Sequence, residues 1–125
     1  MSFDWSDFLV VAEVLSEDET NPSLNAALHR IAISRAYYAA FCTIRNYLRD
    51  KNELIPSNRG DIHAEIIDWL RKSNDMERKR IGNALKRLRD DRNSADYDDI
   101  LTGSPSSMAQ QAIKMAKRII KFTST

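Results

Sequence analysis

Apolar residues recur every three or four positions along most of this 125-residue chain. That spacing places them on one face of an α-helix, whereas a half-buried strand would alternate them at every second position. Only three glycines and three prolines interrupt the pattern. The most regular apolar face lies near the end of the chain and consists of Met108, Ala112, Met115, Ile119 and Phe122. We therefore expect an all-α protein without strands.

The pattern divides into five helical segments separated by turn-forming residues. They cover about residues 4–16, 23–51, 61–72 and 75–97, and a fifth begins at Pro105. No repeat or long linker divides the chain, and a domain usually has roughly 100–150 residues. We expect one domain over residues 1–125, folded as an antiparallel up-and-down bundle of four to five helices.

Several residues at the ends of these segments resemble helix caps and breaks. They are Asn21 or Ser23 before the second segment, Pro56 to Gly60 after it, Asn74 to Glu77 before the fourth, and Ser104 before Pro105. We expect the second and fourth helices to be antiparallel. Their apolar faces should meet through Tyr37, Phe41 and Ile44 on one side and Ile81, Leu85 and Leu88 on the other.

The sequence lacks the signatures of most enzymes and of metal centres. Cys42 is the only cysteine, so neither an internal disulfide nor a cysteine zinc cluster is expected. There is no glycine-rich phosphate loop and no His-Glu-x-x-His motif. His29 and His63 have no partner close in the sequence, so both are expected to be structural or surface residues. We expect no metal and no cofactor.

The expected location is the cytoplasm. No stretch approaches the roughly 18 consecutive apolar residues of a membrane span. Asp4 and Asp7 stand where a signal peptide would carry Lys or Arg. We expect no membrane contact.

Charge is distributed unevenly, although the net charge is only +1. Residues 1–20 hold six acids and no base, whereas residues 71–92 hold nine bases and four acids. The basic region is either a face for a polyanion or a solvated helix flank with ordinary pairing between neighbouring turns.

Arg92 stands where the fourth helix should present an apolar residue. Ile81, Leu85 and Leu88 define the buried face, which continues to Arg92 and Ala95. A guanidinium is costly to bury without partners. Either Arg92 pairs with Asp96, four positions on, or it lies in a cleft or a dimer interface and faces phosphate. Asn93 and Tyr97 share the neighbouring helix edge.

The middle of the second helix combines small residues with two tyrosines. Ser34, Ala36, Ala39 and Ala40 allow another helix to approach closely, and Tyr37 and Tyr38 point roughly 100° apart. One tyrosine is expected in the core with its hydroxyl hydrogen-bonded, and the other along a groove. The alternative is that both are ordinary core and boundary residues.

These two segments together carry a family resemblance. The stretch Ile33-Ser34-Arg35-Ala36-Tyr37-Tyr38-Ala39-Ala40-Phe41, followed by Arg92-Asn93-Ser94-Ala95-Asp96-Tyr97, resembles the HEPN domain family (higher eukaryotes and prokaryotes nucleotide-binding). It is most similar to the small single-domain prokaryotic branch. The resemblance implies a helical bundle that forms homodimers. It also implies a toxin or antiphage role, with a minimal nucleotidyltransferase as the antitoxin partner.

The resemblance also implies site residues. In the family's ribonucleases, an Arg-x4-6-His motif from each subunit forms a composite site for RNA cleavage. Arg92 and Asn93 match the start of that motif, but Tyr97 stands where the histidine is expected. A phenol with a pKa of about 10 is a poor base at neutral pH. The catalytic assignment is Arg92, Asn93 and Tyr97, and the RNA- or nucleotide-binding assignment is Arg35, Tyr38, Arg89 and Asp96.

Three functions remain open at this point. The first is a ribonuclease with a composite Arg92-centred site. The second is a catalytically inactive HEPN module that binds RNA or nucleotide, or that partners a nucleotidyltransferase. The third, which needs no resemblance, is a helical bundle that serves only protein interaction.

Overall fold

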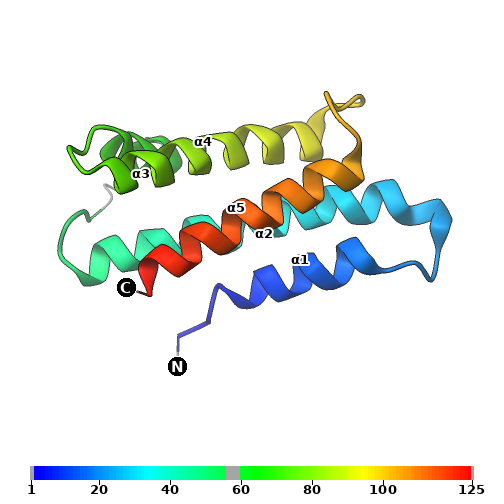
Figure 1. Ribbon diagram of the computed structural model, residues 1–125, viewed down its shortest axis with the longest axis horizontal. Coiled ribbons are helices and arrows are strands. Elements are labelled where there is room, and N and C mark those ends of the chain that lie inside the picture. Colours follow the sequence, from blue (N-terminus) through cyan, green and yellow to red (C-terminus); the bar gives the residue numbers. More distant parts are fainter. Residues whose placement is uncertain (1, 56–59, 125) are drawn as a thin grey trace.

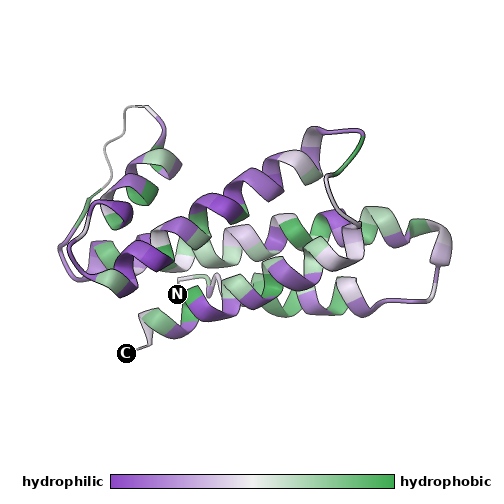
Figure 2. Ribbon diagram, turned by 45° about the horizontal axis from the view of Figure 1, so that its top comes forward, coloured by the Kyte–Doolittle hydropathy of each residue, from purple (hydrophilic) through white to green (hydrophobic). Residues whose placement is uncertain are grey.

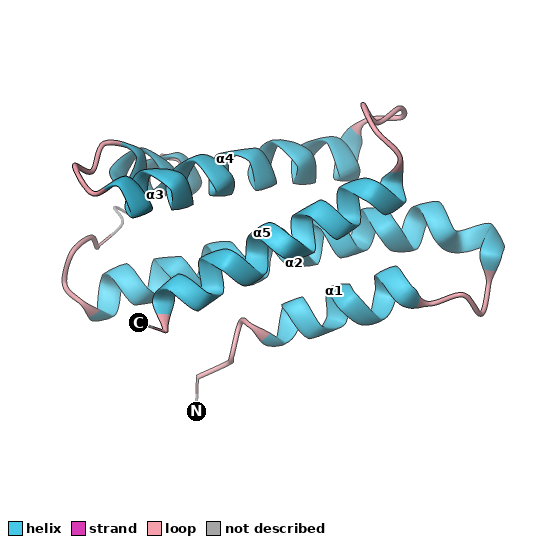
Figure 3. Cartoon of the chain, viewed as in Figure 1, coloured by secondary structure: helices cyan, strands magenta, loops and turns pink. Residues whose placement is uncertain are grey.

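The computed structural model describes residues 2–55 and 60–124, and these form helices and connecting loops without a strand (Figures 1 and 3). The prediction of an all-α fold is confirmed. The elements are α1 (Asp7–Glu17), a short 3-10 turn η1 (Pro22–Leu24), α2 (Asn25–Asp50), α3 (Ile62–Arg71), α4 (Met76–Tyr97) and α5 (Pro105–Thr123).

The long helices form an up-and-down bundle. Along the chain, α1, α2, α4 and α5 run in alternating directions, and α3 lies beside α4 at one end of the bundle (Figure 1). The central helix is α2, which contacts α1, α4 and α5. The predicted antiparallel arrangement of α2 and α4 is therefore correct, and the expected helix bounds agree with the structure to within a few residues.

The hydrophobic core follows the predicted helix faces. The side chains of Tyr37, Ile44, Leu85, Leu88 and Ile119 are fully buried. Hydrophobic stretches lie where the helices face one another, whereas much of α4 is hydrophilic (Figure 2). A helix this polar depends on a narrow apolar face and on its neighbours for stability.

The helix ends agree with the predictions only in part. Ser104 accepts a hydrogen bond from the Ser107 backbone N–H, as expected of the α5 cap. Asp75, rather than Asn74, caps α4. The prediction that Asn21 or Ser23 caps the second helix is wrong. The 3-10 turn occupies this position, and neither that turn nor α2 has a side-chain cap, since Ser23 donates to the Asn21 side chain instead.

Helix α2 ends at Asp50, before the expected break at Pro56 to Gly60. Asn52 has a positive φ of 56°, and the Glu53 N–H donates to the Leu48 carbonyl at 3.0 Å. This is a Schellman ending, which Asn can adopt because it tolerates the left-handed region. Most of the predicted break, residues 56–59, lies outside the described residues.

Arg30 fixes the C-terminal end of α4. Its guanidinium donates to the carbonyl oxygens of Ala95 at 3.0 Å, Asp98 at 2.6 Å and Asp99 at 3.1 Å. The last carbonyls of a helix have no partner within the helix, so a charged donor from α2 satisfies groups that would otherwise need water. This contact holds the Arg92 turn of α4 in place beside α2.

Gly82 allows α3 and α4 to approach closely. A Cβ at this position would lie 2.8 Å from the Arg71 Cγ, 2.9 Å from the Arg71 backbone nitrogen and 2.9 Å from the Leu70 Cβ. Two of these three neighbours belong to the rigid part of α3. Glycine is therefore required at this position for α3 and α4 to pack. This packing also matters for the site described below, because α3 carries one face of it.

We predict that Gly82→Ala destabilises the fold. The clash with α3 should cost about 1–3 kcal/mol, which outweighs the roughly 1 kcal/mol that alanine gains in a helix. Thermal unfolding followed by circular dichroism should show a lower Tm. Gly103→Ala is the matched control, because its Cβ would meet only Met108, at 3.5 Å or beyond. An equal or higher Tm for Gly82→Ala would contradict the prediction.

Candidate functional site

Cationic and aromatic side chains meet where α2, α3 and α4 come together. We call this group the Arg92 cluster and define it as Tyr37 and Tyr38 of α2, His63 of α3, and Arg89 and Arg92 of α4. Ring contacts, hydrogen bonds and charge interactions connect all five residues. The cluster joins parts of the chain that are far apart in sequence.

Arg92 lies in the cluster with its side chain only 12% exposed. Its guanidinium lies 5.2 Å from the ring centre of Tyr37 and 5.3 Å from that of Tyr38, so cation–π attraction offsets part of its lost hydration. The ion pair with Asp96 exists, but the nitrogen–oxygen distance of 3.7 Å is too long for a hydrogen bond. The prediction that Arg92 continues the buried face is confirmed, and so is its pairing with Asp96.

Tyr37 and His63 form the buried centre of the cluster. Tyr37 is fully buried, and its hydroxyl lies 2.5 Å from the His63 Nδ1. Burial raises the pKa of the Tyr37 hydroxyl well above its ordinary value, so the phenol keeps its proton. His63 is the only hydrogen-bond partner of this hydroxyl among the described residues, so the buried O–H proton is satisfied only if Tyr37 donates to Nδ1. The neutral imidazole then carries its own proton on Nε2.

The surroundings of His63 favour its neutral form. Burial lowers the pKa of the imidazole, the charges of Arg89 and Arg92 lower it further, and Asp61 acts in the opposite direction. Phe41 stacks on the ring, with 4.1 Å between ring centres and 17° between planes. At neutral pH, His63 is therefore an uncharged imidazole that stacks on Phe41.

Arg89 is held by the residue that begins α3. It donates to the Asp61 carboxylate at 2.5 Å, and the same carboxylate accepts the backbone N–H groups of His63 and Ala64. The hydrogen bond from Arg89 is the largest contribution that lowers the pKa of Asp61. One carboxylate thus positions both Arg89 and the turn that carries His63.

The structure brings five of the seven predicted site residues against the cluster or into it. Tyr38, Arg89 and Arg92 are members, and Arg35 lies 5.1 Å from the Tyr38 ring centre. Asp96 touches the cluster through Arg92. Asn93 and Tyr97 are exposed, Tyr97 by 78%, and among the described residues neither makes a hydrogen bond, ion pair or ring contact to the cluster. Their assignment stays a prediction.

His63 is the site residue that the sequence did not single out. We expected it to be a structural or surface residue, because no local motif surrounds it. Its partners belong to other helices, 26 residues before it at Tyr37 and 26 residues after it at Arg89. No spacing rule within one segment could have found it.

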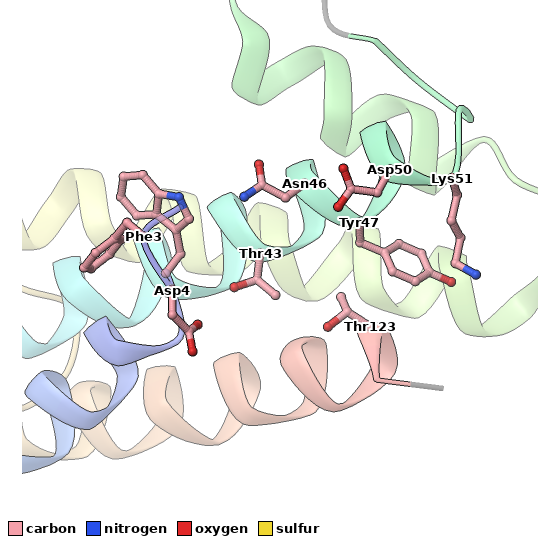
Figure 4. Close-up of a pocket in the computed structure, with 9 residues that line it drawn as sticks. Phe3, Asp4, Thr43, Asn46, Tyr47, Asp50, Lys51 and Thr123 are labelled. Carbon is pink, nitrogen blue, oxygen red and sulfur yellow. The ribbon is translucent and has the colours of Figure 1, made fainter. Parts of the chain in front are cut away.

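A cavity of about 450 Å³ opens beside the cluster and shares Tyr38 and His63 with it. A second cavity of about 370 Å³ lies along the C-terminal half of α2 and beside the end of α5, and it shares Trp5 with the first cavity (Figure 4). Its polar lining includes Asp4, Asp50, Lys51 and Asn46, with more acid than base, and it contains no member of the Arg92 cluster. The first cavity is therefore the one connected to the candidate site.

Other kinds of site find little support in the part of the chain that the structure describes. No group of three or more His, Cys, Asp or Glu residues there is placed to hold a metal ion. Cys42 is buried, which raises the pKa of its thiol and disfavours the nucleophilic thiolate. None of the described helices is long and apolar enough to cross a membrane.

We predict that His63 makes folding stability depend on pH. In the unfolded chain its pKa returns to about 6.5, so just below that pH the unfolded state binds more protons than the folded state. The contribution of His63 to the free energy of unfolding should be greatest above about pH 6.5 and should decrease as the pH drops. It should level off once the pH is below the pKa of His63 in the folded protein. Urea unfolding across this range measures the effect. His63→Gln should weaken the dependence and His29→Gln should keep it, whereas equal dependence in all three proteins would contradict the prediction.

Comparison with known proteins identifies the family. A family model for the HEPN domain matches residues 13–125, which include every member of the Arg92 cluster. The chain is 33% identical over 108 residues to an uncharacterized protein of Methanocaldococcus jannaschii; the match covers 77% of this chain and 64% of that protein's length. No solved structure gives a significant match. With the family model matching nearly the whole helical bundle, this chain belongs to the HEPN domain family.

Proposed function

We propose that this HEPN protein binds RNA by holding a phosphate against the Arg92 cluster. The observation that supports this most strongly is that Arg92 makes no hydrogen bond to any described residue, although its side chain is only 12% exposed. A buried donor without an acceptor costs about 1–3 kcal/mol. A phosphate oxygen could accept from the outer Nη groups of Arg92, whose nearest described carboxylate, that of Asp96, lies 3.7 Å away.

Phosphate fits the donors of this site. A guanidinium presents a planar fork that matches two phosphate oxygens, and the surrounding rings weaken competition from water. The neutral His63 adds an Nε2–H donor without adding charge. Arg89 adds a second guanidinium, whose charge is shared with Asp61. Asn93 and Tyr97, on the exposed edge of α4, would contact RNA that extends beyond the site.

Ribonuclease activity is the second candidate, and the position of His63 favours it. This imidazole from α3 lies within the electrostatic reach of Arg92, whereas the family motif takes its histidine from the same segment as the arginine. Cleavage without a metal requires a base for the 2′-hydroxyl. With Tyr37 donating to Nδ1, however, the proton of neutral His63 is on Nε2, so neither nitrogen is free to accept one. The geometry therefore favours binding over cleavage, and a toxin or antiphage role depends on the second candidate.

The proposal includes a homodimer, in which two Arg92 clusters would face a common RNA, and a minimal nucleotidyltransferase as a partner. Twofold symmetry would repeat the same surface on both subunits.

We predict a mass of twice 14.4 kDa by light scattering at high micromolar concentration. A monomer under those conditions would contradict the homodimer.

We predict that Arg92→Ala weakens binding of single-stranded RNA by about 10-fold to 100-fold, since a hydrogen bond to a charged group contributes about 1.5–3 kcal/mol. Arg92→Lys should recover little of the loss, because an ammonium lacks the fork. Fluorescence anisotropy at fixed salt measures the affinity, and circular dichroism checks the helical content.

Lys86→Ala is the control for this experiment. Lys86 lies on the same helix, is exposed, and pairs with Asp90 at 2.9 Å, so its loss should change affinity only slightly. If Arg92→Ala and Lys86→Ala bind RNA as well as the parent protein, the Arg92 site is wrong. RNA integrity on a gel separates the two candidates: cleavage by the parent protein that disappears in His63→Gln, with binding kept, would establish the ribonuclease.

A further inference from the structure

The cavity beside the Arg92 cluster is walled by aromatic rings from separate elements. Trp5 and Phe8 contribute from the N-terminal region, Tyr38 and Phe41 from α2, and His63 from α3. Its volume of about 450 Å³ lies within the usual range for small-molecule sites, roughly 300–1,000 Å³. Trp5 and Phe8 precede residues 13–125, the part of the chain that the family model matches.

The charges in this cavity are positive and lack carboxylate partners. Arg35 and Arg45 belong to its lining, which contains no acidic residue. Neither arginine forms an ion pair with a described carboxylate. Instead, Arg35 lies 5.0 Å from the Phe8 ring centre and 5.1 Å from that of Tyr38, and Arg45 lies 5.5 Å from that of Trp5. The other cavity, in contrast, contains Asp4 and Asp50.

We propose that this cavity is a nucleobase subsite. It would receive the base of the nucleotide whose phosphate rests on the Arg92 cluster, so this inference rests on the proposed function. Tyr38 connects the two sites, because it lines the cavity and also lies against the Arg92 guanidinium. Flat aromatic faces stack on any base, and arginine at the rim donates to base oxygens and nitrogens.

The chemistry of the lining supports a base more than a simple anion or an apolar ligand. Rings dominate the wall, which favours a flat ligand, and two unpaired guanidiniums disfavour one that is purely apolar. Inorganic phosphate would use only the cations. A nucleotide uses both, because it joins a flat, polar base to an anion.

Fluorescence of Trp5 tests the subsite directly. The chain has two tryptophans, and Trp69 lies on α3 in the lining of a different cavity. Trp69→Phe therefore leaves Trp5 as the reporter. Because Trp5 also lines the second cavity, the Phe8 and Tyr47 variants below decide which cavity holds the nucleotide. Titration with the four nucleoside monophosphates should give saturable quenching, corrected with free N-acetyltryptophanamide. Inorganic phosphate at the same ionic strength should give none. Equal signals from phosphate and from nucleotides, or no saturable signal, would overturn the subsite.

Variants then identify the wall that holds the base. In the Trp69→Phe background, Phe8→Leu removes a ring but keeps an apolar side chain. It should weaken nucleotide binding by about 5-fold to 100-fold if one stacking contact is lost. Tyr47→Leu is the matched control, because Tyr47 is an aromatic residue in the wall of the other cavity. It should leave the affinity unchanged.

Arg45→Gln provides a second reading if Phe8→Leu fails to fold, since Arg45 belongs to the lining but not to the Arg92 cluster. It should also weaken nucleotide binding. Unchanged affinity in a folded Phe8→Leu or in Arg45→Gln would overturn the subsite. If Arg92→Ala still weakens RNA binding in that case, the proposed function stands and only the subsite fails. If Arg92→Ala has no effect either, both fail.

Discussion

The guanidinium of Arg92 lying on the rings of Tyr37 and Tyr38 is the interaction on which the site depends. A charge at this depth needs compensation, and here it comes from two ring faces and a distant Asp96 rather than from close hydrogen bonds. The buried face of α2 that carries Tyr37 also carries the small residues Ala36, Ala39 and Ala40. Packing thus creates an environment in which a cation is held firmly while its donors stay available for a ligand.

His63 changes how the departure from the family's ribonuclease motif is understood. The histidine position of that motif holds Tyr97, which is exposed and apart from the cluster. The imidazole in the cluster comes instead from α3, and a buried phenol determines which of its nitrogens carries the proton. Whether a histidine can act as a base depends on that partner as much as on its own pKa. The same two residue types could support cleavage or binding, and the direction of one hydrogen bond distinguishes them.

Sequence reasoning reached the features that repeat along one helix. The helical periods predict the five helices, and the break in the apolar face of α4 singles out Arg92. It also predicted that one of the two tyrosines would be buried with a bonded hydroxyl and the other would line a groove, without saying which; the structure buries Tyr37 and places Tyr38 in a cavity wall. It could not predict which individual side chains from different helices meet at the site. His63 is defined by partners on α2 and α4, and the end of α2 depends on the positive φ of Asn52, which no apolar pattern encodes.

Apart from Asp75 and Glu77 at its start, the charges near the two ends of α4 run against the helix dipole. Cationic residues 78–80 lie near its N-terminus, where a helix favours anions, and Asp96, Asp98 and Asp99 lie near its C-terminus, where it favours cations. The described contacts of Arg78 with Glu53 and of Arg30 with the last carbonyls offset this unfavourable arrangement from outside the helix. As an isolated peptide, the α4 segment would have little reason to be helical. The arginines therefore acquire their geometry only when the whole bundle assembles, and a fragment carrying the motif would not carry the site.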